Sequence, residues 1–231
     1  MINLEKIITN ILVKSLSDFN HKLSNLDLDF HNSNGFLKSD IINSNLEREI
    51  KKYSSYKSHR FKKGSWEILL LINQLEKKVY SFTTENNIQH IYKKNNFNHY
   101  MQVISSQLNK NIETNVSQMS FFNDYESISK RQKTTFKSIT NNFDLNGYEY
   151  YIISYSVKDG IISEIYKRKF NQNFECVEKE SLIHLLKPNY ADLTEVDIYS
   201  IENNFNKNNS PKNTKKVKLT LKEKAIKVKN G

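Results

Sequence analysis

The fold is decided by a short stretch, Trp66-Glu67-Ile68-Leu69-Leu70-Leu71-Ile72. It is too short for a typical helix and apolar at both alternating sets of positions, which predicts a central strand covered on both faces. Residues 73–78 then turn the chain, and Val79-Tyr80-Ser81-Phe82 has the character of a partner strand. The sequence therefore predicts an antiparallel hairpin at the centre of a sheet.

A second hairpin is predicted further along the chain. Its strands are 148–155 and 161–170, and the turn between them contains Asp159-Gly160. Tyr148-Glu149 aligns with Trp66-Glu67 at an offset of 82 residues. Two interpretations stay open: a duplicated half-domain that forms a pseudo-symmetric sheet, or a likeness that any two amphipathic hairpins share.

Helices are predicted on both sides of the first hairpin. Residues 4–23 place apolar side chains at steps of three and four, the period of a helix that buries one face. Ser39-Asp40 can cap a second helix that runs to about Tyr53. The class is therefore α+β, with antiparallel hairpins packed against helices. Further predicted elements are helices over 97–112, 125–140, 181–186 and 194–205, and a short strand over 174–177.

Length and charge set the domain organisation. The chain has 231 residues, which suits a single domain over 1–205 followed by a segment with almost no apolar content. That segment, 206–231, is predicted to be a disordered lysine-rich tail. Residues 207–231 hold nine Lys against one Glu, so they carry +8 of the net charge of +10. The predicted domain is close to neutral.

Several classes of protein are disfavoured. The single cysteine, Cys176, cannot form an intramolecular disulfide or a cysteine-based zinc cluster. The six histidines are scattered, so neither a metal site nor a cofactor is predicted, and no glycine-rich phosphate loop is present. Residues 1–15 lack the apolar core of a signal peptide, and the longest apolar run, Ile68–Ile72, is far too short to cross a bilayer. We expect a cytoplasmic protein without a membrane partner.

One segment has the composition of a nucleic-acid contact. Residues 51–63 interleave six cationic side chains with three aromatic ones, and phosphates attract cations while unstacked bases lie on rings. The alternative is a solvated connection that Tyr53 and Phe61 anchor to the core. The candidate nucleic-acid-binding residues here are Lys51, Lys52, Tyr53, Lys57, Arg60, Phe61, Lys62 and Lys63.

The tail offers a second candidate contact. Lys215, Lys216 and Lys218 lie in its lysine cluster and would give salt-dependent contact with DNA or RNA that does not depend on base sequence. The alternative is that the lysines only keep the chain soluble. Because the lysines would contact phosphates and not base edges, sequence specificity would have to come from the folded residues.

A metal-dependent nuclease is an alternative with weaker support. Such an enzyme needs two or three carboxylates and a lysine that converge at the end of a strand. The candidates are Glu67, Glu149, Asp159, Glu164 and Lys167, but their spacing follows no compact nuclease motif. No catalytic residue is assigned.

The first hairpin carries a resemblance. The Trp66–Phe82 hairpin, followed by His99-Tyr100 at the start of a helix, is similar to an uncharacterised family of bacterial proteins. The likeness covers about residues 60–190 and rests mostly on apolar positions. The resemblance implies a bacterial origin. It implies no known activity and assigns no catalytic residue to this chain.

Three functional hypotheses follow. The leading one is a non-enzymatic, nucleic-acid-associated protein, as found in mobile elements or phage-defence loci. The second is the metal-dependent nuclease, acting through Glu149, Asp159 and Glu164. The third is a protein-binding adaptor or inhibitor. The sequence does not fix the ligand, the pathway or the oligomeric state.

Overall fold

The computed structural model describes residues 3–24, 34–94, 97–112, 125–141 and 143–186, which form an α+β fold as predicted. The predicted helix over 194–205, the boundary at 205 and the tail lie outside the described residues. None of the described helices has the length and apolar character that crossing a bilayer requires. The elements are α1 (Leu4–Ser24), α2 (Asn34–Ile50), β1 (Tyr56–Lys63), β2 (Trp66–Asn73), β3 (Lys78–Thr84), α3 (Glu85–Lys94), α4 (Tyr100–Leu108), α5 (Tyr125–Thr140), β4 (Glu149–Lys158), β5 (Ile161–Phe170), β6 (Cys176–Ser181) and the 3-10 turn η1 (Ile183–Leu185).

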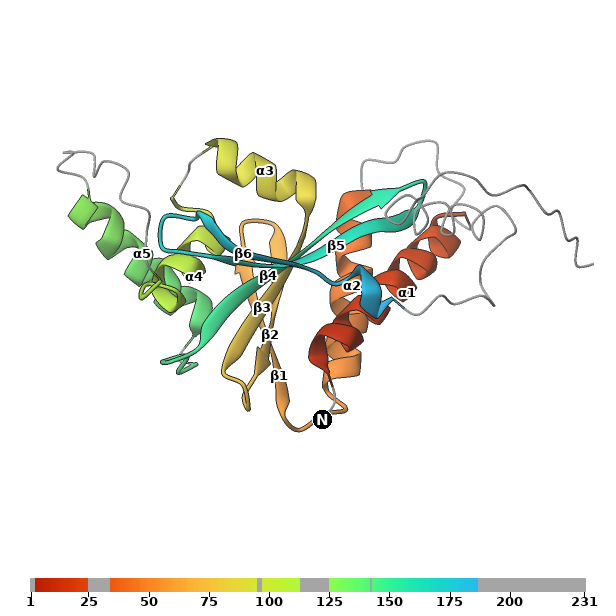
Figure 1. Cartoon of the computed structure of the whole chain (residues 1–231), viewed down its shortest axis with the longest axis horizontal. Coiled ribbons are helices and arrows are strands. Elements are labelled where there is room, and N and C mark those ends of the chain that lie inside the picture. Colours follow the sequence, from red (N-terminus) through yellow and green to blue (C-terminus); the bar gives the residue numbers. More distant parts are fainter. Residues whose placement is uncertain (1–2, 25–33, 95–96, 113–124, 142, 187–231) are drawn as a thin grey trace, which may run out of the picture. The chain divides into compact units, whose positions relative to one another are not determined.

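The strands form one sheet in sequence order, from β1 to β6. Every neighbouring pair is antiparallel except β3 and β4, which are parallel. Parallel neighbours require a crossover connection, and here the crossover consists of α3, α4 and α5. The sheet consequently lies between two layers of helices, with α1 and α2 on one face and α3–α5 on the other (Figure 1).

Strand β2 is covered on both faces, as its sequence predicts. Leu69 and Leu71 pack with the apolar residues of α1 and α2, whereas Leu70 and Ile72 pack with those of α3, α4 and α5. None of the four is more than 3% exposed. The stretch is apolar at every position because alternate side chains enter different cores.

Strand β1 corrects one prediction. Residues 51–63 were expected to form a polar connection, but Tyr56–Lys63 is an edge strand whose eight residues all pair with β2. Its sequence is polar because only Phe61 is buried, which an edge strand tolerates. The hairpin geometry therefore determines the strand more than its own hydrophobic pattern does.

Two helices also differ from expectation. Helix α2 begins at Asn34 rather than near Ser39, and it ends at Ile50 rather than Tyr53. Helix α3 was not predicted, since only Ile88 and Ile91 of its ten residues are buried. The predicted helices over 4–23 and 125–140 correspond to α1 and α5 within a residue.

The two hairpins do not form a symmetric pair at the offset of 82. Strands β2 and β4 run in opposite directions, because β3 is antiparallel to β2 and parallel to β4. The second hairpin keeps the strand order of the first but runs in the opposite direction, so a symmetry axis that related them would have to lie in the sheet and would exchange its two faces. Equivalent residues would then lie on opposite faces. Leu69 and Tyr151, which are equivalent at the offset of 82, instead belong to the same core cluster on one face. The geometry favours two similar but independent hairpins.

A carboxylate joins α2 to β1 and supports a first prediction. Glu47, on α2, accepts hydrogen bonds from both Nε and Nη2 of Arg60, with Nε at 2.9 Å, and from Ser58 Oγ at 3.3 Å. The Arg60 hydrogen bonds lower the pKa of Glu47 to about 2, more than burial raises it. Glu47 therefore stays ionised at pH 7.

We expect Glu47→Gln to lower the free energy of unfolding at pH 7 by about 1–2 kcal/mol, because charge-assisted hydrogen bonds become neutral ones while Arg60 remains half exposed. Urea denaturation measures the loss. Glu76→Gln is the control, since the Glu76 side chain is 44% exposed against 11% for Glu47, and its pair with Lys78 should matter by a few tenths of a kcal/mol, on the order of a surface pair. Equal losses in the two variants would contradict the prediction.

A candidate anion-binding pocket on a basic surface

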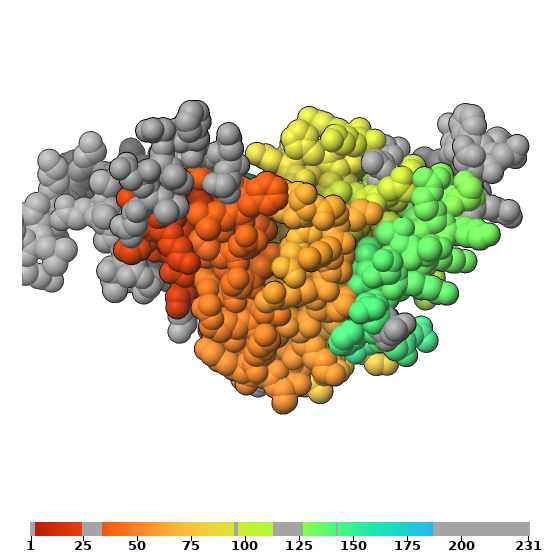
Figure 2. Space-filling model, turned by 180° about the vertical axis from the view of Figure 1, so that it is seen from behind, coloured from red at the N-terminus to blue at the C-terminus, as the bar shows by residue number. Residues whose placement is uncertain are grey.

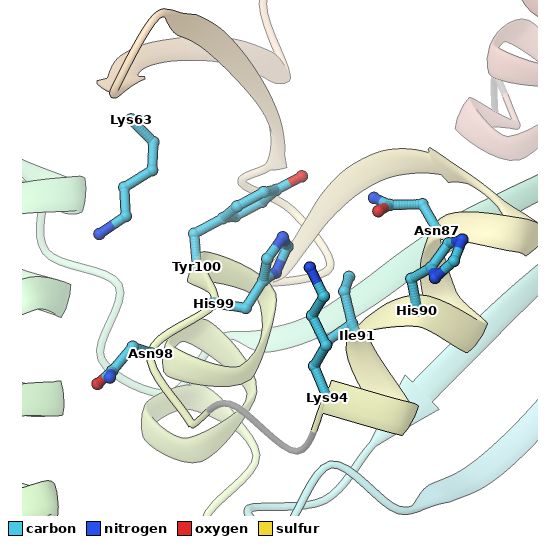
Figure 3. Close-up of a pocket in the computed structure, with 8 residues that line it drawn as sticks. All are labelled: Lys63, Asn87, His90, Ile91, Lys94, Asn98, His99 and Tyr100. Atoms are coloured by element: carbon cyan, nitrogen blue, oxygen red, sulfur yellow. The ribbon is translucent and has the colours of Figure 1, made fainter.

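A pocket opens between the β1–β2 hairpin, α3 and the start of α4 (Figure 3). Its volume is about 370 Å³, which is enough for a phosphate group and part of a larger ligand. None of its lining residues is acidic. They are Lys63, Asn87, His90, Ile91, Lys94, Asn98, His99 and Tyr100.

Helix α3 directs three polar side chains into the pocket. The helix starts after Thr84, whose Oγ1 accepts the backbone N–H of Asn87 at 3.3 Å, in the manner of an N-cap. Ile88 and Ile91 hold it against the sheet. Since residues three, four and seven apart share a helix face, Asn87, His90 and Lys94 lie together along the pocket.

Helix α4 presents its N-terminus to the same pocket. His99 is the N-cap: its Nδ1 accepts the backbone N–H of Met101 at 3.3 Å, and Gln102 Oε1 accepts the backbone N–H of His99 at 3.3 Å. This is a capping box in which histidine takes the place of serine or threonine. The positive end of the helix dipole adds to the attraction for an anion.

His99 is neutral at pH 7. Burial, together with the smaller effect of the nearby charge of Lys63, lowers the pKa of His99 to about 4. Because Nδ1 accepts a hydrogen bond, the ring proton of the neutral form resides on Nε2, which makes Nε2 a donor. The pocket thus combines two ammonium groups with neutral donors and no carboxylate.

The pocket belongs to a wider basic surface, which we define by seven exposed cations. Two lie on β1, one on α3 and four on α5, and none forms an ion pair with any residue in the described part of the chain. Residues 127–141 contain no acidic residue. Figure 2 shows α3, β1 and α5 on one face of the molecule. The seven are Lys57, Lys63, Lys94, Lys130, Arg131, Lys133 and Lys137.

Direct contacts join the elements of the basic surface. Gln132 of α5 donates to the carbonyl of Phe97 at 3.0 Å, immediately before the pocket residue Asn98. His59 Nε2 of β1 lies 2.6 Å from the carbonyl oxygen of Ile139 on α5. The ammonium group of Lys57 lies over the ring of Phe143, 5.9 Å from its centroid. Helix α5 is therefore fixed between the pocket and the edge strand.

The model of DUF5986, a family of unknown function, matches residues 3–231, nearly the whole chain. The chain belongs to the DUF5986 family. No curated protein and no solved structure shows significant similarity to it. The match confirms the resemblance to an uncharacterised family, while the bacterial origin of this DUF5986 protein remains a prediction.

The structure divides the predicted nucleic-acid residues of 51–63 into three groups. Lys51, Lys52 and Arg60 form ion pairs with glutamates of α2. Tyr53 hydrogen-bonds Glu49 at 3.4 Å, and Phe61 is buried in the core, which confirms its anchoring role. Three of these candidates are exposed and have no described ionic partner: Lys57, Lys62 and Lys63. Lys57 and Lys63 belong to the basic surface. Lys62 points to the opposite face of the sheet, which carries α2, because side chains alternate along a strand.

The remaining candidates are not brought together. Glu149 and Asp159 lie at opposite ends of the ten-residue strand β4, about 30 Å apart at the usual rise per residue. Glu149 instead binds Lys169 at 2.8 Å. No group of three or more side chains suited to hold a metal exists within the described ranges. Lys215, Lys216 and Lys218 lie outside those ranges.

The sequence did not predict the pocket residues of α3 or the role of His99. Asn87, His90 and Lys94 lie on α3, which was not predicted, and His99 entered only through the family resemblance. A signal for α3 was present, because Ile88 and Ile91 are three residues apart between an acidic first turn and a basic last turn.

Proposed function

We propose that this DUF5986 protein binds nucleic acid through the basic surface of β1, α3 and α5. The observation that carries the proposal is that seven exposed cations, without described acidic partners, lie on β1, α3 and α5, and that two of them line a pocket without carboxylates. Phosphate backbones are the polyanions that such a surface attracts.

The charge pattern supports DNA or RNA over an acidic small molecule. The cations extend beyond the pocket onto α5, where Lys130, Lys133 and Lys137 follow one another at helical spacing. A single small anion would occupy the pocket alone, whereas a nucleic-acid strand would also contact α5. The lysine-rich tail would add contacts that do not depend on base sequence.

The test is a salt titration of binding to labelled DNA and RNA. We expect Lys130→Gln/Lys133→Gln/Lys137→Gln to weaken binding and to reduce the slope of log K against log salt by about 2, because each phosphate contact adds roughly 0.7 to 0.9 to that slope. The matched control removes three exposed lysines of α1, on the opposite layer, as Lys6→Gln/Lys14→Gln/Lys22→Gln.

The control should leave the slope unchanged. Equal effects of the two triple variants would show that only net charge matters and would count against the basic surface. If the unaltered protein binds no nucleic acid at low salt, the proposal is wrong and the hypothesis of a protein partner takes precedence. A chain ending at Phe205 separates the contribution of the tail, since an unchanged slope would remove the tail from the interface.

A further inference from the structure

Two aromatic rings form an exposed stack where Trp66, at the tip of the β1–β2 hairpin, meets Phe36 in the first turn of α2. Trp66 and Phe36 lie with ring centroids 4.1 Å apart and planes inclined by 16°. Each is 44% exposed, and neither belongs to either core cluster. Large aromatic side chains normally contribute to the core, so a stacked pair that is half open to solvent suggests a binding surface.

The stack is next to the anion-binding pocket. Trp66 pairs with Lys63 in the β1–β2 ladder, and Lys63 also lines the pocket. Directly paired residues of antiparallel strands have Cβ atoms about 5 Å apart. A ligand can therefore contact the aromatic stack with one part and Lys63 with an adjoining anionic part.

We infer that Trp66, supported from behind by Phe36, is a stacking platform for an unpaired base, so that the nucleic acid bound is single-stranded. The inference rests on the proposed function. Charge complementarity selects this occupant: a nucleotide offers a flat ring beside a phosphate, which matches an exposed indole beside Lys63. In a duplex the bases are stacked on each other and their faces are not available to the indole.

A second exposed aromatic fits the same arrangement. Phe97 is 37% exposed and directly precedes the pocket residue Asn98. Aromatic side chains thus occur at the hairpin tip, beside Lys63, and at the entry to α4, beside Asn98. Alternating rings and cations are the pattern with which proteins bind single strands without base preference.

Trp66 is the only tryptophan in the chain, so its fluorescence reports directly on the platform. The full chain is titrated with a single-stranded oligonucleotide, with the duplex of the same sequence and with inorganic polyphosphate, which has the charge but no bases. We expect the single strand to quench the fluorescence. The duplex and polyphosphate, which can contact only the cations, should bind more weakly and without comparable quenching.

Trp66→Ala should weaken single-strand binding by about 5- to 150-fold, the range seen when a stacking aromatic is removed. Trp66→Phe should restore most of the affinity because a ring remains. Leu75→Ala is the control, since Leu75 is 70% exposed in the turn at the opposite end of β2, and it should bind like the unaltered protein. A thermal melt of each variant shows whether it is folded.

The outcomes separate the two proposals. The protein could bind single strands in a salt-dependent way without quenching, and Trp66→Ala could bind as well as the unaltered protein. That result would overturn the platform and leave the basic surface intact, and a protein partner would then be the alternative ligand of the stack. Equal quenching by the duplex or by polyphosphate would also overturn it. Absence of binding to any of the nucleic acids would overturn the proposed function itself.

Discussion

Replacing Asn109 by alanine should lower the free energy of unfolding by about 3–6 kcal/mol, because three buried backbone groups would lose their hydrogen-bond partner at roughly 1–2 kcal/mol each. Asn109 follows α4 and is only 2% exposed. A loss of this size is a large fraction of the 5–15 kcal/mol that is typical of a whole domain.

The side chain of Asn109 completes the β4–β5 ladder. Its Nδ2 donates to the carbonyl of Tyr150 at 2.9 Å and to that of Phe170 at 2.8 Å, while its Oδ1 accepts the N–H of Tyr150 at 3.0 Å. The regular pairing of the two strands starts one residue further on, at Tyr151 and Lys169, where β5 also has an irregularity. The amide thus takes the place of a missing backbone partner.

Urea denaturation at pH 7 measures the effect, and Asn111→Ala is the matched control. Asn111 is exposed, so its replacement should change stability by about 0.5 kcal/mol at most. Asn109→Asp tests the donor role of Nδ2. Aspartate keeps the size of the side chain and one acceptor oxygen, but its second carboxylate oxygen would replace Nδ2 and repel the carbonyl oxygens of Tyr150 and Phe170. It should cost at least as much as alanine, and a loss below about 1 kcal/mol in both variants would refute the bridging role.

The central part of the fold could be predicted from local patterns. Strand β2 is apolar throughout because both of its faces are covered, and α1 repeats its buried residues at the helical period. Asp159 and Gly160, the tight turn of the β4–β5 hairpin, both have positive φ, which explains why the Asp-Gly pair marks the turn correctly. These features depend on neighbours in sequence.

The candidate site could not be predicted in the same way, because its residues meet only through the crossover. Lys63 is the last residue of β1, an edge strand. Lys94 is the last residue of α3, and β2 and β3 lie between the two lysines in the sequence. Their common pocket depends on the parallel pairing of β3 with β4, which places α3 and α4 over one face. No local pattern encodes that pairing.

The role of Arg60 shows the same limit at a single residue. By composition it is one more cation of 51–63, but the strand geometry directs it to Glu47 of α2. Lys63, three residues later, lies on the other face of β1 and lines the pocket. The alternation of β1, a strand that was not predicted, therefore directs Arg60 to an ion pair with Glu47 and Lys63 to the pocket.

Acidification should destabilise the protein through His99 before it affects Glu47. The pKa of His99 is about 4 in the folded state because of burial, against 6.5 for an exposed imidazole. Between these values the unfolded chain binds a proton that the folded chain excludes, so stability is complete above about pH 6.5 and decreases as the pH falls towards 4. One pKa unit corresponds to about 1.4 kcal/mol, which gives roughly 2 kcal/mol by pH 4.5.

The contribution of Glu47 has a separate window and the usual sign for a carboxylate. Its folded pKa of about 2 lies below its ordinary value of 4.5, so its stabilisation is present above pH 4.5 and is lost as the pH falls towards 2. Urea denaturation between pH 7 and pH 4.5 therefore isolates His99 from Glu47.

His99→Asn distinguishes titration from capping. Asparagine is a good N-cap and does not titrate, so the variant should keep most of its stability at pH 7 and lose about 2 kcal/mol less than the unaltered protein between pH 7 and pH 4.5. His99→Ala, which removes the cap, should be less stable at both pH values. An NMR titration of the His99 ring gives the pKa directly, and inorganic phosphate in the pocket should raise it by stabilising the imidazolium form. A His99 pKa near 6.5 without phosphate, or an unchanged pH dependence in His99→Asn, would show that the ring is not held in the neutral form by the fold.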